Sequence, residues 1–413
     1  MRYFKLIMLF VFIFMFLYLD GCIAHNKDVI YYYENINDVF SDINNNCVGK
    51  QSVANKEMSH VSITSQDGVY TICLLQNTVA YGTLFTNDTN INLNGFTLES
   101  KEFSINVGGV CRIYNGFLNG FCENNKNYYG IVIGSQATCY IENVAINATS
   151  NCNTNFAINA YGTLFLYNST VCINSVISNQ DTKTIAIYGN IFSSIYIENS
   201  KIISSSDFGC VEGVRVVDNG KIANSQIIAH SNYQFDGTRF TSRSIGCSNY
   251  GNLEINNCTI YGVHSGINSS GNLSIDSGIY LGYGHGGLYC SGSKTRYKIA
   301  NAIFSQAEMP DGYEDIDTGS MKSGLYIGGQ KNSNNVEVFI DNCIIRGDKN
   351  AIVLRGTSGE INNSLYVSNI ILDVQHIRVD NETHRIYIGT GCEFEYVSVD
   401  IPHIVVYTED FYG

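Results

Sequence analysis

The sequence has no tryptophan, only two prolines among 413 residues and few charged side chains. Charged residues make up 15% of the chain, which is too little for the Glu- and Lys-rich surfaces of helix bundles. Acidic residues outnumber basic ones by 37 to 24, and the net charge of −13 argues against nucleic acid as a partner. After Leu19, no segment is long and apolar enough to span a bilayer.

What the chain does contain is typical of β structure. Hydrophobic residues make up 45% of it, with 29 Tyr, 21 Phe and 39 Gly. That apolar fraction can bury a large core, which excludes disorder of the chain as a whole. Plentiful aromatic and β-branched residues with abundant glycine favour strands joined by tight turns.

The N-terminus has the features of an export signal. Arg2 and Lys5 precede an apolar run that ends at Leu19, too short for a comfortable membrane span. The run ends in Leu-Asp-Gly-Cys22, which resembles the lipobox of bacterial lipoproteins, although Asp20 departs from that pattern. The resemblance implies that residues 1–22 hold a signal peptide and lipobox, that the chain is cleaved before Cys22, and that lipidated Cys22 anchors it at the cell surface. The alternative is cleavage after Ala24 and plain secretion.

A repeat emerges when the chain is aligned on asparagine. Its unit is aliphatic-x-Asn-x-x-aliphatic, with a mean spacing of about 28 residues, which is in the range of solenoid proteins. Asn tolerates the left-handed conformation of a sharp turn, and stacked amides can bond to one another. The predicted turn positions are Asn115, Asn143, Asn168, Asn199, Asn224, Asn257, Ser277, Asn301, Asn342 and Asn369.

Three short strands per repeat can bury their alternating apolar side chains only inside a coil. Here the sequence resembles the right-handed parallel β-helix (pectate-lyase-like) superfamily, with its asparagine ladder. We therefore expect an all-β solenoid over residues 61–407 and a tail at 408–413. Residues 23–60 are expected to hold a linker and a cap, because Ile36, Val39, Phe40 and Ile43 have helical spacing within 34–46.

The 14 cysteines follow the repeat. Cys111 and Cys139 lie four residues before a turn Asn, and Cys258 and Cys343 lie one after. Matching positions favour small buried side chains stacked along the coils. The spacing of adjacent coils also permits a disulfide between Cys111 and Cys139, so both alternatives stay open.

The sequence offers no complete catalytic constellation. Gly284-His285-Gly286 and Arg296-Tyr-Lys298 match elements of polygalacturonases of this fold. However, His264 stands where that family's paired Asp should lie, and Arg296 falls on the second strand rather than the first. Inverting hydrolysis needs two carboxyl groups flanking the bond, so we interpret the match as accidental.

Pectate lyases instead need acidic Ca²⁺ ligands and a base. Arg215, with Glu212 and Asp207 before it, is the basic and acidic group on the predicted outer face of the first strands. It is either a solvated ion pair or a site for an anionic sugar. The predicted outward row is Val132, Ala186, Arg215, Gly246, Tyr289, Tyr326 and Val353.

Two further groups could bind ligands. Asp311, Glu314, Asp315 and Asp317 form an acidic loop that is either a Ca²⁺ site or merely solvated. Tyrosine rings can stack on sugars, and equally can be structural. The tyrosines expected at loops and outer faces, and offered as binding residues, are Tyr261, Tyr283, Tyr289 and Tyr326.

Two functions of different class follow. The first is an exported, lipid-anchored β-helix that binds glycans or other surface polymers without catalysis, as an adhesin does. The second is a polysaccharide lyase or glycoside hydrolase acting on acidic polysaccharides. Its candidate catalytic residues are Arg215, Glu212, His264 and His285.

Overall fold

The computed structural model describes the chain from residue 29 to residue 407 with gaps. The described residues are 29–53, 59–66, 68–101, 104–122, 127–176, 181–231, 243–307, 323–328, 336–348, 350–355, 364–373, 377–379, 385–388, 392 and 406–407. The predicted signal, including Cys22, and the acidic loop lie outside them. Among the described residues, no helix is long and apolar enough to cross a membrane.

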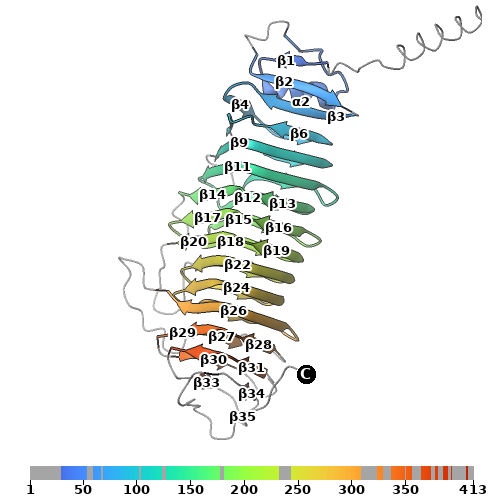
Figure 1. Ribbon diagram of the computed structural model, residues 1–413. Helices are drawn as coiled ribbons and strands as arrows, with labels where there is room; N and C mark the ends of the chain where they lie inside the picture. The colour runs from blue at the N-terminus through green and yellow to red at the C-terminus, as the bar shows by residue number, and fades with distance from the viewer. Residues whose placement is uncertain are drawn as a thin grey trace, which may run out of the picture.

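The chain winds into one right-handed parallel β-helix, as predicted, and its coils stack into an elongated rod (Figure 1). Twelve strands, one from each successive coil, form the sheet that we call the first face. Its strands are β5 (Leu84–Thr86), β8 (Ile105–Val107), β10 (Asn127–Ile133), β12 (Thr154–Ala160), β15 (Lys183–Gly189), β18 (Cys210–Val216), β21 (Arg243–Asn249), β23 (Ser265–Ser269), β25 (Leu288–Cys290), β27 (Ser323–Gly328), β30 (Asn350–Arg355) and β33 (Ile377–Val379).

The second and third strands of the coils belong to a 23-stranded sheet. In five coils these two strands are one continuous strand that bends at the turn Asn or Ser. The members are β1 (Tyr31–Tyr33), β2 (Val61–Gln66), β3 (Val69–Leu74), β4 (Thr78–Tyr81), β6 (Thr89–Asn92), β7 (Thr97–Lys101), β9 (Val110–Cys122), β11 (Thr138–Ser150), β13 (Thr163–Tyr167), β14 (Thr170–Ser175), β16 (Ser194–Glu198), β17 (Lys201–Ser206), β19 (Asn219–Ala223), β20 (Gln226–Ser231), β22 (Asn252–Gly262), β24 (Asn272–Gly282), β26 (Arg296–Gln306), β28 (Glu337–Asp341), β29 (Ile344–Arg346), β31 (Ser364–Ser368), β32 (Ile371–Leu372), β34 (Arg385–Ile388) and β35 (Val406–Tyr407).

All ten predicted turn positions line up in one column, which confirms the asparagine ladder. Each has a left-handed φ between 47° and 66°, and the strand register places each beside the next. The amides bond between coils: Asn257 Nδ2 donates to Asn224 Oδ1 at 3.0 Å. At the Ser277 position the amide of Asn301 turns instead to Asp276, at 2.8 Å.

The ladder begins one coil earlier than predicted, at Asn94. Its φ is 51°, and Ile91 pairs with Ile113 of the next coil. Asn94 follows Ile91 by three residues, whereas Asn115 follows Ile113 by two. Because of this extra residue, the turn at Asn94 does not match the aliphatic-x-Asn repeat.

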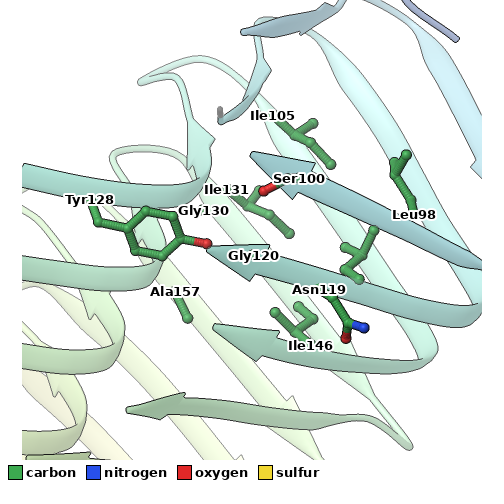
Figure 2. A pocket seen from close by; sticks show the side chains of 11 residues that line it. Leu98, Ser100, Ile105, Asn119, Gly120, Tyr128, Gly130, Ile131, Ile146 and Ala157 are labelled. Carbon is green, nitrogen blue, oxygen red and sulfur yellow. The ribbon is translucent and has the colours of Figure 1, made fainter. Parts of the chain in front are cut away.

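The core fills the interior of the coils with aliphatic side chains in register. The cysteines predicted to stack inward, Cys111, Cys139, Cys258 and Cys343, are all buried, and Cys111 lies directly opposite Cys139. A small, partly open pocket of about 20 Å³, shown in Figure 2, lies beside the buried Tyr128 and has room for a single water rather than a ligand.

A cap closes the N-terminal end, as predicted. Helix α2 (Ile36–Asn44) buries Ile36, Val39, Phe40 and Ile43, and lies at the blue end of the rod (Figure 1). Strand β2, which follows the helix, pairs antiparallel with β1 before the helix and with β3 after β2. The repeat pattern does not predict this antiparallel pairing. Asp42 of the helix is buried, and its Oδ2 accepts from Gln51 N at 2.9 Å. Burial opposes ionisation of Asp42, but the hydrogen bonds from Gln51, Tyr33 and Cys47 together outweigh it and lower the pKa of the carboxyl.

The ladder makes a direct prediction about stability. Asn257→Val should reduce the free energy of unfolding by about 2 kcal/mol, because a β-branched residue resists left-handed φ and the amide bond is lost. Asn257→Gly keeps the conformation and should lose about 1 kcal/mol. Urea denaturation followed by circular dichroism measures both. Asn256→Val, at the neighbouring exposed strand position, is the control, and an equal loss there would contradict this role for the ladder.

Candidate functional site

The outer side of the first face carries the residues on which the sequence analysis concentrated. Strand register gives its outward row as Val132, Asn159, Tyr188, Arg215, Ser248, Asn268, Tyr289, Tyr326 and Val353. The prediction was therefore wrong at two positions, since Tyr188 and Ser248 occupy the places assigned to Ala186 and Gly246.

Ala186 and Gly246 belong instead to a row of small inward residues. Ala186 and Ile187 are both fully buried, so the strict in-and-out alternation is interrupted there, as it is at a β-bulge. A Cβ added to Gly246 would lie 2.4 Å from Ile260 Cγ2, which leaves room only for glycine. Because of this interruption, the outward positions differ from those that strict alternation along the sequence predicts.

Arg215 is held by Glu212 at the centre of the first face. Arg215 Nε donates to Glu212 Oε2 at 2.7 Å, and Nη2 contacts Oε1, so both carboxylate oxygens are engaged. Glu212 is 1% exposed and Arg215 is 16% exposed, so the pair is buried rather than solvated. The sequence left open whether Arg215 forms a solvated ion pair or a site for an anionic sugar. The first alternative is wrong, because the pair is buried. Asp207 lies in the turn before β18.

Aromatic rings surround this pair. The Arg215 guanidinium carbon lies 5.5 Å from the Tyr188 ring centroid and 5.4 Å from that of Tyr250. Lys183 Nζ lies 5.0 Å from Tyr188 and 5.5 Å from Phe156, whose ring stacks on Tyr188 at 4.7 Å. We call these six residues, Phe156, Lys183, Tyr188, Glu212, Arg215 and Tyr250, the cation–aromatic cluster.

The two cations of the cluster differ electrostatically. Burial alone would lower the pKa of Arg215, but the hydrogen bonds and charge of Glu212 outweigh it and raise that pKa. Burial, followed by the charge of Arg215, lowers the pKa of Lys183. No sequence pattern indicates Lys183, because a loop of variable length separates it from Arg215 and only the stacking of the coils brings the two side chains together.

The structure also brings His264 and His285 together. His285 Nδ1 lies 2.9 Å from His264 Nε2, and the rings meet edge to face. His264 is buried and His285 is half-buried. Burial, followed by the charges of His285 and Arg243, lowers the pKa of His264 well below its ordinary value. The histidine pair is thus held with a neutral His264.

The proposed binding tyrosines do not form an open aromatic surface. Tyr289 stacks on His285 at 4.7 Å and contacts Tyr326 at 5.2 Å, and these two tyrosines are 8% and 1% exposed. Tyr283 is also buried, and Tyr261 is half-buried. Tyr289 and Tyr326 do lie on the outer side of the first face, as expected, but their side chains and that of Tyr283 are buried there.

Among the residues that the structure describes, no group of three or more His, Cys, Asp or Glu side chains could hold a metal ion. The predicted Ca²⁺ ligands Asp311, Glu314, Asp315 and Asp317 lie outside the described residues. Arg296 and Lys298 lie on β26, a second strand, as expected from the sequence.

Comparison with known proteins assigns no family. No family model matches the chain, and no curated protein matches it significantly. The site must therefore be interpreted from its own geometry.

Because the Arg215–Glu212 pair is buried, we predict that removing one partner destabilises the fold far more than replacing both. Arg215→Ala leaves the Glu212 carboxylate buried without its counter-ion, and should cost about 3–5 kcal/mol of folding free energy. The double variant Arg215→Met, Glu212→Gln removes both charges and should lose much less. Chemical denaturation of the three proteins checks this. A single variant as stable as the double one would contradict a buried pair.

The neutral His264 predicts a pH-dependent stability. Its folded-state pKa is depressed, so only the unfolded chain binds the proton readily near pH 6.5. Stability should be complete above that pH and fall as the pH drops toward the folded-state pKa. In His264→Phe this contribution to the pH slope should disappear. Thermal unfolding from pH 8 to pH 5 measures it, and identical slopes in both proteins would contradict the assignment.

Proposed function

We propose that the protein is an exported, surface-anchored β-helix that binds acidic glycans at the cation–aromatic cluster without cleaving them. The export signal and lipobox resemblance of residues 1–22 support the location at the cell surface. The resemblance to the pectate-lyase-like superfamily supports an extended polymer as ligand, because many of its members act on uronic-acid polymers.

The observation that carries this proposal is the placement of Arg215 and Lys183 against three aromatic rings. Tyr250, which is 49% exposed, gives a ring on which a sugar can stack. The cationic groups beside it can bind a carboxylate or sulfate, and Arg favours such planar recognition. Local cations thus favour an acidic ligand even though the whole chain carries a charge of −13.

The same geometry favours binding over catalysis. Glu212 is the carboxylate of the cluster, and both its oxygens are engaged by Arg215. A general base must also come within reach of the substrate proton, whereas the Glu212 side chain is only 1% exposed. The Arg215–Glu212 pair therefore serves better as a fixed charge than as an acid or base.

A lyase or hydrolase remains the second candidate, because His264 and His285 could transfer protons. His264 directly precedes β23, and Ser265 of that strand lies two coils from Glu212. At about 4.8 Å per coil, the histidines and the Arg215 pair are separated by roughly 10 Å along the rod. This separation favours two independent sites over one catalytic constellation.

Binding of a uronic-acid oligosaccharide, measured by calorimetry, tests the proposal. Lys183→Gln and Tyr250→Ala should each weaken binding about tenfold, and added salt should weaken it further. Tyr81→Ala, which removes a 59% exposed ring near the N-terminal cap, is the matched control and should have no effect. Absorbance of unsaturated uronate products in the same mixture would overturn the proposal in favour of a lyase.

A further inference from the structure

A polar surface groove runs along part of the asparagine ladder, on the 23-stranded sheet and away from the first face. It is shallow and open to solvent, spans four coils and has a volume of about 510 Å³. Asn168, Asn199, Asn224 and Asn257 line it, together with the residue two positions after each. We call it the ladder groove.

The groove coincides with a change in the sequence pattern. The residues two positions after those four asparagines are polar and lie side by side: Thr170, Lys201, Gln226 and Thr259. In the flanking coils the same column holds Ala145 on one side and Ile279 on the other. The polar segment is therefore limited to the coils that form the groove, which a purely structural ladder does not require.

The floor of the groove is rigid and already hydrogen-bonded. Ser169, Ser200 and Ser225 are buried, and each Oγ accepts from a backbone N–H of the preceding coil at 3.1 Å. Each also donates to a carbonyl two residues earlier in its own coil. The exposed amides and hydroxyls above this floor are thus held in fixed rows, which lowers the entropic cost of binding.

The chemistry of the lining indicates the ligand class. Lys201 is the one charged residue among the described residues that line the groove, and the rest offer amides and hydroxyls. Such groups pair with the hydroxyls of a neutral sugar. An Asn amide and a polar side chain two residues after it recur about every 4.8 Å along the rod, so an extended chain lying parallel to the axis would meet a similar pair of polar groups at each coil of the groove.

We propose that the ladder groove binds a short segment of a neutral linear polysaccharide, aligned with the axis of the β-helix. This site is separate from the cation–aromatic cluster. It stands on its own observations and does not depend on the function proposed for Arg215 and Lys183.

Calorimetry with cellohexaose and xylohexaose on the full chain tests this inference. Lys201→Met and Gln226→Leu, both at exposed positions, should each weaken binding at least fivefold, because they keep the bulk and remove the polar group. Lys298→Met, at an exposed position of β26 outside the groove, is the matched control and should leave binding unchanged. Lys183→Gln should also leave it unchanged, and added salt should have little effect.

Any of three results would overturn the inference. One is the absence of binding to either neutral oligosaccharide at millimolar concentration. A second is binding that Lys201→Met and Gln226→Leu do not weaken. Salt-sensitive binding of only acidic oligosaccharides at Lys201 would likewise replace a neutral ligand with an anionic one. Each outcome can be separated from the test of the cation–aromatic cluster, because Lys183→Gln and Tyr250→Ala should weaken only binding at that cluster, whereas Lys201→Met and Gln226→Leu should weaken only binding in the ladder groove.

Discussion

The structure depends on backbone hydrogen bonds between coils that are kept in register by one sharp turn. Each coil bends at a left-handed Asn or Ser, and the strands on either side of the bend pair with the same strands of the next coil. No coil can bury its apolar side or satisfy its strand edges alone, so the stack as a whole is the folding unit. The antiparallel cap with α2 covers the N-terminal edge that this arrangement leaves open.

This register has a functional consequence, because it places residues from distant parts of the sequence in straight rows. Lys183, Glu212 and Tyr250 come from three successive coils. Glu212 and Tyr250 contact Arg215 directly, and Lys183 lies over the same Tyr188 ring as Arg215 does. The ladder groove arises in the same way from four coils. A surface of repeated rows suits an extended polymer better than a compact small molecule, and both proposed sites share this property.

Much of the fold could be predicted from the sequence, and less of the site. The turn asparagines and the cap helix are local patterns that the chain repeats or encodes within one segment. Ala186 was misplaced because two consecutive inward residues interrupt the alternation, and Asn94 was missed because its turn is one residue longer. Lys183 could not be paired with Arg215, because coil lengths vary and only three-dimensional register identifies neighbours. The burial of Tyr289 and Tyr326 likewise depends on packing that no local pattern encodes.

The most direct test of the functional account is a crystal structure of the protein soaked with a uronic-acid oligosaccharide. The account predicts an intact ligand on the first face, with a carboxylate within hydrogen-bonding distance of Arg215 or Lys183 and a sugar ring on Tyr250. A ligand bound only beside His264 and His285, or one whose glycosidic bond has been broken, would contradict it.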